Sequence, residues 1–385
     1  MLKDSYFRLQ LIVFALVAAA YSNMYLVQPV LPIMQTEFAV DMVTISFTAS
    51  FVILGMALSN MPAGFLADRF SIKPIILTGG LLVTIAGFVC ATTQDLSILI
   101  GARFIQGVFT PPITACLAAY LAKTLPPDRI NIVLGSYVSA TVLGGMSSRL
   151  LGGWIHTAFH WRYAFVVASL LTLITTIIAL WSLPKSSTSA KQKRDSTSYL
   201  QLLKRWELVR LFICTSGVYA VFSSIFNYLP YRLKEPSFDV STEITTLLYL
   251  VYVVGIFIGP IAGRINNRFG TGNVLVVGCL IASGSLIIFL IPSLITFIIG
   301  LLGICLGFFT VHATSVGALN HKLSSGQGRA NALYVLSYYI CGWIGITASG
   351  FAYEQGGWNI FIYLCLIIIT IPILASISER ISNKP

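Results

Sequence analysis

The sequence predicts an all-α membrane protein with twelve transmembrane helices in two six-helix repeats and with both termini in the cytoplasm. Composition is the first observation behind this prediction. Of the 385 residues, 56% are hydrophobic and 10% are charged, and the mean hydropathy is +0.86. Ordinary soluble proteins have about 25% charged residues. A cytosolic enzyme, a secreted disulfide-bonded protein and a disordered chain are therefore excluded. Segment length and an internal repeat are the other two observations.

Twelve apolar segments have about the length that crosses a bilayer. The run that begins at residue 9 has no small-residue cleavage site, so we interpret it as the first span rather than a signal peptide. A polar stretch over 184–208 contains SSTSAKQKRDSTS, and this composition predicts a cytoplasmic linker between two halves, 1–183 and 209–385. The expected spans are 9–34, 42–65, 74–93, 97–123, 130–156, 162–183, 209–232, 243–263, 273–292, 294–320, 328–353 and 357–377.

Lysine and arginine residues set the orientation, because they are enriched in cytoplasmic loops. With the N-terminus in the cytoplasm, 19 of the 24 basic residues fall on the cytoplasmic side. Three fall outside, namely Arg162, Arg232 and Lys234, and two fall within spans, namely Arg103 and Arg149. This bias accounts for the net charge of +11 without a nucleic-acid partner.

The two halves repeat at a distance of about 200 residues, which supports a parallel duplication. Two six-span halves of this kind are a transporter architecture, with the substrate site between the halves near the bilayer midplane. The matches are Ala63, Gly64, Arg69 and Phe70 with Ala262, Gly263, Arg268 and Phe269, and Gly107, Phe109 and Thr110 with Gly307, Phe309 and Thr310.

The loop after the second span reads GFLADRFSIK over 64–73 and is similar to the loop signature of the major facilitator superfamily. That family usually has Gly and Arg where Ser71 and Ile72 stand. The resemblance implies a conformational latch whose contacts form in one access state and break in the other. The alternative is a solvated loop that obeys the charge bias. The latch would comprise Gly64, Asp68, Arg69 and Lys73.

Two further motifs resemble the same family. The fourth span contains Arg103-Phe-Ile-Gln106-Gly107, which is similar to the RxxQG signature of its proton-coupled members. The fifth span has glycines at the spacing of the antiporter signature, although Ser148-Arg149 stands where the family usually has Gly-Pro. Small residues at four-residue spacing also let helices approach closely. We therefore expect helix packing, and a seal between the halves, at Gly144, Gly145, Gly152 and Gly153.

Three other stretches, GGMSSR, NYLPYRL and FFTVHA, resemble a subgroup of the bacterial drug-efflux and arabinose-efflux-type permeases. The resemblance covers nearly the whole chain. It implies the major facilitator fold and places the chain in the proton-antiporter branch of the family.

Two arginines lie inside spans, where a charge is unfavourable unless it is paired or hydrated. Arg103 and Gln106 share a polar stripe of the fourth span, and Arg103 either snorkels outward or points inward to bind an anion or to act on a neighbour. Arg149 lies about 10 Å below the outer end of the fifth span, counting about 1.5 Å per residue. We expect it to belong to the outer gate or to the substrate path.

His312 is the one histidine deep inside a predicted span. It is either a hydrogen-bonded core residue or the carrier of a coupled proton. No Asp or Glu falls in the central part of any predicted span, which favours the second interpretation.

Tyrosines and amides share faces of the first, seventh and eleventh spans, and together they predict an amphipathic pocket for ring-bearing or hydroxylated solutes. Aromatic residues near span ends are often only interfacial. The candidates are Tyr25 and Gln28, Asn227 and Tyr231, and Tyr334 and Tyr338.

The predicted function is secondary active transport across the inner membrane by alternating access, with proton-coupled efflux of a small amphipathic organic solute. The alternative is a facilitator or exchanger of an organic anion, possibly for uptake, that uses Arg103 and Arg149. An enzyme is not expected, because no GxSxG or HExxH motif occurs, and no GxxxxGK[ST] motif indicates nucleotide use. A sensor would more often carry a large extra domain.

The expected partners are the small-molecule substrate, protons and membrane lipid, with the protein as a monomer. We expect no cofactor and no metal, because the seven cysteines lie far apart in apolar segments without a CxxC pair.

Overall fold

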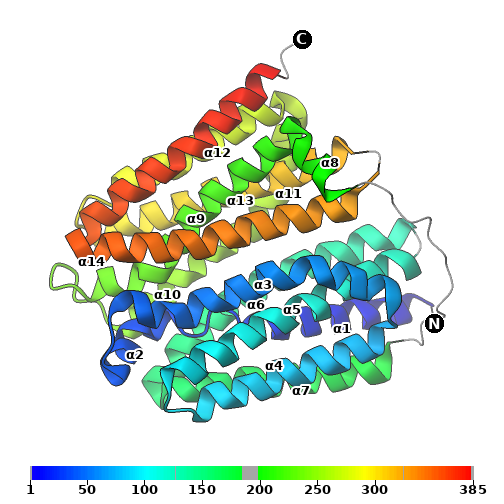
Figure 1. Ribbon diagram of the computed structural model, residues 1–385, viewed down its shortest axis with the longest axis horizontal. Helices are drawn as coiled ribbons and strands as arrows, with labels where there is room; N and C mark the ends of the chain where they lie inside the picture. Colours follow the sequence, from blue (N-terminus) through cyan, green and yellow to red (C-terminus); the bar gives the residue numbers. More distant parts are fainter. Residues whose placement is uncertain (1, 126, 184–197, 324, 383–385) are drawn as a thin grey trace. The chain divides into compact units, whose positions relative to one another are not determined.

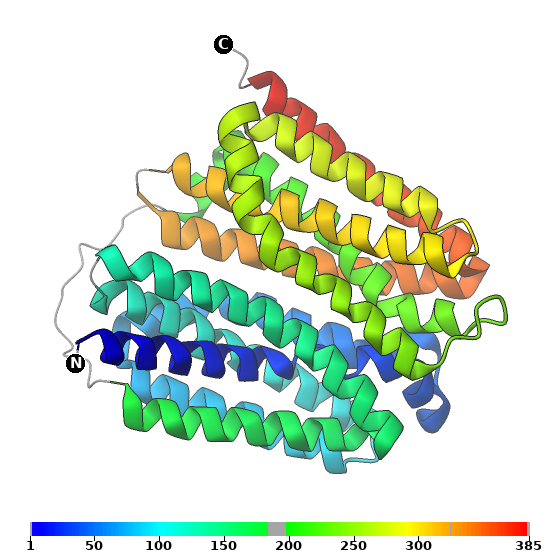
Figure 2. The same cartoon turned by 180° about the vertical axis from the view of Figure 1, so that it is seen from behind.

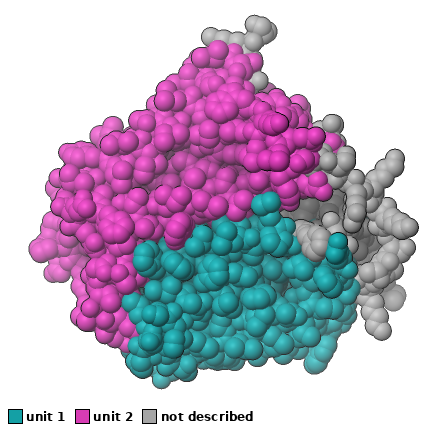
Figure 3. All heavy atoms as spheres, in the orientation of Figure 1, with its two compact units in different colours: residues 1–34, 47–193 teal, residues 35–46, 194–385 magenta. Residues whose placement is uncertain are grey.

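The computed structural model describes residues 2–125, 127–183, 198–323 and 325–382. Within these ranges the chain is helical and contains no strand. The chain forms two compact units, which Figure 3 colours separately. Unit 1 contains residues 1–34 and 47–193, and unit 2 contains residues 35–46 and 194–385.

Unit 1 is built mainly from the helices of the first half of the chain (Figure 1). Polar residues mark several helix ends. The Asp95 carboxylate accepts hydrogen bonds from the Ser97 and Ile98 N–H groups where α5 begins, because the first N–H groups of a helix have no partner within it. The elements are α1 (Leu2–Ser22), η1 (Gln28–Val30), α2 (Leu31–Phe38), α3 (Met42–Arg69), α4 (Ile72–Thr92), α5 (Leu96–Thr124), α6 (Pro127–Ala158) and α7 (Trp161–Ser182).

Unit 2 contains the helices of the second half. Its last helix, α14, covers two predicted spans, and it kinks at Gly356 and Gly357, where Gly357 has a φ of 65°. Glycine adopts that backbone conformation without a steric penalty. The elements are α8 (Tyr199–Lys204), α9 (Trp206–Lys234), α10 (Thr242–Leu248), η2 (Tyr249–Val253), α11 (Val254–Phe269), α12 (Thr271–Ile288), α13 (Leu294–His321) and α14 (Gln327–Ser382).

Each of the twelve predicted spans falls on helix, so the predicted fold class is confirmed. In the described part of the chain, nine helices are long and apolar enough to cross a membrane. One of these is α14 with its two spans, α1 adds a shorter apolar stretch over Phe7–Ser22, and α6 holds the remaining predicted span. The first and eighth spans differ from the prediction of continuous helices, because turns or 3-10 segments interrupt them at 23–30 and 249–253.

The helices of the two units pack in matching pairs (Figures 1 and 2). In unit 1, α1 packs on α6, and α4 packs on both α5 and α7. In unit 2, α9 packs on α14, and α12 packs on both α13 and α14. The repeat in the sequence therefore corresponds to a repeat in packing.

The predicted linker at 184–208 lies partly outside the described residues, which resume at Ser198. Residues 35–46 cluster with unit 2. There the Val43 N–H donates to Glu354 Oε1 at 3.1 Å, and the Tyr228 hydroxyl donates to Ser46 Oγ at 3.2 Å. These contacts join the beginning of α3 to α9 and α14.

Candidate functional site

The first predicted span breaks in its middle. Helix α1 ends at Ser22, turns follow, and helix resumes with η1 at Gln28. Pro29 lies just after the break, and a proline has no N–H to donate and clashes with the carbonyl four residues earlier. The break leaves backbone carbonyls without their usual helical donors inside the membrane-spanning part of unit 1.

Arg103 of α5 supplies donors to these carbonyls. Its guanidinium donates to the Asn23 carbonyl at 2.6 Å and to the Met24 carbonyl at 2.5 Å. It also donates to the Thr48 carbonyl of α3 at 2.8 Å and to Gln106 Oε1 at 2.6 Å. The Arg103 side chain is 0% exposed, so it does not reach a surface by snorkelling. It fastens the break in the first span to α3 and α5.

Gln106 and Asn23 extend this network. The Gln106 amide donates to Asn23 Oδ1 at 3.3 Å, and the Asn23 amide donates to Thr172 Oγ1 of α7 at 2.8 Å. All three side chains are buried. Asn23 and Thr172 were missed at the sequence level, although an Asn six residues before Pro29 in an apolar run is a signal that points to the break.

Arg149 of α6 reaches the same segment from another helix. Its Nε donates to Gln28 Oε1 at 2.7 Å and its Nη1 donates to the Gly145 carbonyl at 2.7 Å. The guanidinium carbon lies 3.8 Å from the centre of the Tyr25 ring, within cation–π range. Three predicted residues, Arg149, Gln28 and Tyr25, therefore meet.

The Gln28 side chain has an N–H donor that lacks a hydrogen-bond partner among the described residues. Gln28 is 0% exposed, and its Nε2 has no hydrogen-bond partner among the described residues. Buried polar groups are almost always hydrogen-bonded. An acceptor oxygen would satisfy this donor, which lies beside the Arg149 guanidinium.

Glycines of α6 bring that helix against the break. A Cβ added at Gly152 would lie 1.8 Å from the Leu26 carbonyl oxygen, and one added at Gly144 would lie 2.6 Å from Tyr21 Cβ. At Gly145 the nearest atom would be 3.6 Å away, an ordinary contact. Gly153 is also buried in α6. Close packing at Gly144 and Gly152 thus holds Arg149 near Gln28.

Unit 2 has its own polar centre, where His312 of α13 meets Tyr334 of α14. The Tyr334 Oη lies 2.8 Å from His312 Nδ1 and 3.1 Å from Thr215 Oγ1 of α9. Tyr334 is 1% exposed, whereas His312 is half-buried. The three side chains link three helices through one hydroxyl.

Aromatic rings surround this centre. The Tyr338 ring lies 5.7 Å from the His312 ring and 4.9 Å from the Tyr219 ring, measured between centroids. Phe308 stacks on Phe222 at 4.3 Å and lies 5.5 Å from His312. Tyr338 is half-buried, so this cluster offers ring faces to a solute. The sequence pointed to Tyr338 but not to the phenylalanines, which look like ordinary core residues.

Asn227 and Tyr231 lie one turn apart on α9 and are buried, at 0% and 8% exposure. Neither the Asn227 amide atoms nor the Tyr231 hydroxyl makes a hydrogen bond of ordinary geometry among the described residues. The structure therefore places both predicted residues on one helix, with polar atoms available, but does not join them to His312 by a hydrogen bond.

The surroundings of two predicted latch residues, Gly64 and Asp68, lie outside the described part of the structure. Arg69 ends α3 and is exposed. Lys73, in the first turn of α4, donates from Nζ to the Leu180 carbonyl at 2.8 Å. A cation at the end of α7 compensates the negative end of that helix dipole.

A buried ion cluster in unit 2 was missed altogether. Among the described side chains, Glu379 of α14 is the one carboxylate that is fully buried, at 0% exposure. It pairs with Arg210 of α9 at 2.9 Å and with Lys322 of α13 at 2.5 Å. A buried carboxylate needs such partners, but the sequence separation of the three residues hides the cluster.

Comparison with known proteins extends these observations. The model of the family described as "Major Facilitator Superfamily" matches residues 13–346. The chain is 28% identical over 370 residues to the "Inner membrane transport protein YnfM" of Escherichia coli, which covers 94% of this chain and 89% of that protein. It is 25% identical over 366 residues to an uncharacterized transporter of Buchnera aphidicola from Schizaphis graminum, with the same coverage.

Solved structures of transporters have the same fold. A bacterial homologue of the human lysosomal transporter Spinster, in an inward-facing and unoccupied conformation, superposes with a TM-score of 0.76 at 15% identity, over 99% of this chain and 94% of that one. A D-xylose–proton symporter superposes with a TM-score of 0.74 at 15% identity, over 97% of each chain. At this identity the likeness concerns the fold alone.

Proposed function

The chain belongs to the major facilitator superfamily and is a multi-pass secondary transporter, and from this premise we propose that it couples proton movement to the efflux of a small amphipathic organic solute. The observation that carries the proposal is the hydrogen-bonded chain of His312, Tyr334 and Thr215. Histidine is the side chain whose ordinary titration falls between pH 5 and 8.

This chain of hydrogen bonds changes direction with the charge of His312. When Nδ1 is unprotonated it accepts a hydrogen bond from the Tyr334 hydroxyl. When the imidazole is charged, both ring nitrogens are donors, so the Tyr334 hydroxyl accepts from His312 and its own proton turns to Thr215. One proton on α13 therefore alters hydrogen bonds on α14 and α9, the coupling that a proton-driven transporter requires.

Side chains of α9, α13 and α14 support an amphipathic solute. Tyr338 and the phenylalanines present ring faces, and aromatic pairs prefer offset or edge-to-face contact with other rings. Asn227 and Tyr231 supply a donor and acceptors that make no hydrogen bond of ordinary geometry among the described residues. A solute with a ring and a hydroxyl, amide or carbonyl group satisfies both kinds of surface.

We further propose outward transport across the inner membrane by alternating access, with a monomeric protein and with both termini in the cytoplasm. The distribution of lysine and arginine supports this orientation. The name of the relative YnfM supports an inner-membrane location. The proposed halves are 1–183 and 209–385, and the proposed latch remains Gly64, Asp68, Arg69 and Lys73.

The experiment that tests coupling uses the full chain in proteoliposomes loaded with a pH-sensitive dye. Solutes are chosen beforehand by a thermal-shift screen, because a ligand that binds the folded state raises its apparent stability. A solute that raises stability and moves protons across the vesicle membrane supports the proposal. Binders that cross the membrane equally fast with and without a pH gradient, and move no protons, contradict it.

A second candidate function rests on a different observation. The unpartnered Gln28 Nε2 lies beside the Arg149 guanidinium, and an amide donor next to a cation is a suitable site for a carboxylate or sulfonate. This favours a facilitator or exchanger of an organic anion, with Arg103 holding the segment in place. Exchange of a radiolabelled aromatic carboxylate that is independent of pH gradient and is lost in Gln28→Leu supports this candidate over proton-coupled efflux.

A further inference from the structure

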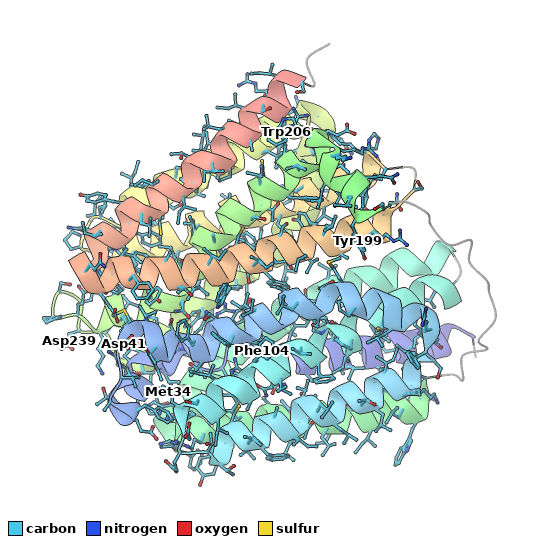
Figure 4. All side chains as sticks on the ribbon, in the orientation of Figure 1. Met34, Asp41, Phe104, Tyr199, Trp206 and Asp239 are labelled. Carbon is cyan, nitrogen blue, oxygen red and sulfur yellow. The ribbon has the colours of Figure 1, made fainter. Side chains whose placement is uncertain are left out.

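Helix α8 leaves a row of apolar side chains uncovered. It buries Leu202, which is 0% exposed, against unit 2. Leu200 and Leu203 are 70% and 48% exposed, and Trp206 at the start of α9 is 56% exposed. Figure 4 labels Tyr199 and Trp206, the first residues of α8 and α9. Leu200 and Leu203 lie on one face of α8, and Trp206 begins α9 just after α8 ends at Lys204; we call these three exposed side chains the apolar ridge.

A lysine lies on the exposed side of this ridge. At about 100° per residue, Lys204 lies about 40° round the helix from Leu200, whereas Leu202 lies about 160° away. Lys204 is exposed, and no ion pair of its ammonium group is found among the described residues. The combination is therefore an apolar ridge next to an exposed cation that has no ion pair among the described residues.

The neighbouring basic residue is already engaged. The Arg205 guanidinium forms an ion pair with Glu207 and donates to the Lys322 carbonyl at 3.2 Å. The hydrogen bond from Arg205 holds the pKa of the Glu207 carboxyl below its usual range, so this pair remains ionised and largely neutralises itself. Within α8, Lys204 is therefore an exposed cation that an external anion can contact.

The surrounding sequence also carries a net positive charge. Residues 184–210 contain seven lysines and arginines but two acidic residues. Basic clusters next to membrane spans attract anionic lipid headgroups. Tryptophan and leucine on the apolar side of a short amphipathic segment enter the boundary between headgroups and acyl chains.

We propose that α8 and Trp206 form an interfacial anchor that binds an anionic phospholipid headgroup through Lys204. Leu200, Leu203 and Trp206 enter the boundary between headgroups and acyl chains. The ammonium group of Lys204 contacts the phosphate of the headgroup. A second copy of the chain is the less favourable occupant, because two copies of this face would bring like charges together.

The test uses the detergent-purified full chain and native mass spectrometry with phosphatidylglycerol and phosphatidylcholine as probes. The wild type should bind phosphatidylglycerol in preference. Lys204→Ala should reduce that preference about fivefold, the effect of one basic side chain at an anionic surface. Lys204→Arg should retain it. Trp206→Ala should weaken binding of both lipids, because it removes apolar contact rather than charge.

Lys234 is the matched control, since it is an exposed lysine at the other end of α9. Lys234→Ala should leave the preference unchanged. Equal losses in Lys204→Ala and Lys234→Ala would overturn the proposal, as would equal binding of the two lipids by the wild type. A protein dimer that Trp206→Ala dissociates would also overturn it, in favour of self-association.

Discussion

The two arginines embedded in unit 1 differ in what their guanidinium groups do. Arg103 directs its donors to the backbone at the break and to Gln106, so it acts as a positioning residue. Arg149 stacks on Tyr25 and shares the Gln28 side chain, which retains an unpartnered donor. Arg149 is therefore the arginine that lies next to a buried amide donor without a hydrogen-bond partner among the described residues.

The first prediction concerns Arg149. Replacement by alanine should leave the protein inserted but abolish transport, and Arg149→Lys should retain roughly a tenth of the initial rate. A lysine is a point charge without the planar fork, so it cannot contact Gln28 and the Gly145 carbonyl and also stack on Tyr25. The measurement is initial flux into proteoliposomes at matched protein density. Unchanged flux in Arg149→Ala would show that transport does not need the Arg149 side chain.

Residue types and depths were predictable from the sequence, whereas most contacts were not. A charge inside an apolar run marks Arg103 and Arg149 at once, and His312 stands out in the same way. Most of their partners come from other elements, and a hydropathy pattern contains no information about which helices touch. Glu379 illustrates the limit, because its partners Arg210 and Lys322 lie on two other helices.

At the scale of elements, α6 depends on two glycines that differ in their surroundings. Gly152→Ala should destabilise the protein by about 1–3 kcal/mol, as overpacking does, because the new Cβ meets the Leu26 carbonyl. Gly145→Ala is the matched control in the same helix, and it should be neutral or slightly stabilising. Melting temperatures in detergent compare the two variants. Equal melting temperatures would mean that α6 does not pack closely on the interruption of the first span at 23–30.

The N-terminus of α3 yields a prediction about pH. Asp41 accepts from the Thr44 N–H at 2.7 Å and from the Thr44 hydroxyl at 2.5 Å. The hydroxyl hydrogen bond, chiefly, lowers the pKa of the Asp41 carboxyl from its usual value. Because the folded-state pKa is the lower one, this cap stabilises the protein above about pH 4 and is lost as pH falls further.

Asp41→Ala should therefore lower stability by about 1 kcal/mol at pH 7, a typical effect for loss of a helix cap. The difference from wild type should shrink below about pH 4. Asp41→Asn, which can cap but does not titrate, serves as control. Thermal denaturation at pH 7 and pH 3 provides the comparison. A difference that persists unchanged at pH 3 would show that the carboxylate charge contributes nothing to the cap.

The helices themselves follow from apolar length, and their ends follow from loop residues such as Asp95 and the Gly356-Gly357 pair. The interruption in the first span is less visible, because Pro29 shows that a helix is disturbed but not where the chain turns. At 249–253 the sequence YLVYV contains neither proline nor glycine, and nothing local announces the 3-10 turn. Tertiary packing decides such positions.

At the scale of the whole molecule, composition, twelve apolar segments and the internal repeat suffice to predict the fold. They do not determine the solute, because one fold serves many functions and function depends on the site. His312 makes its hydrogen bond with a residue of another helix, and the buried Asn227 amide makes no hydrogen bond of ordinary geometry among the described residues. The substrate class is accordingly inferred from surface chemistry.

In the proposed mechanism His312 carries the coupled proton. The most direct test measures accumulation of a solute found in the thermal-shift screen against its gradient, in proteoliposomes with an imposed pH gradient. Wild-type protein should concentrate the solute. His312→Ala should lose this uphill transport yet retain downhill exchange, because the pathway remains while the titrating group is gone. Accumulation in His312→Ala that matches wild type, with the same pH dependence, would show that His312 does not carry the coupled proton.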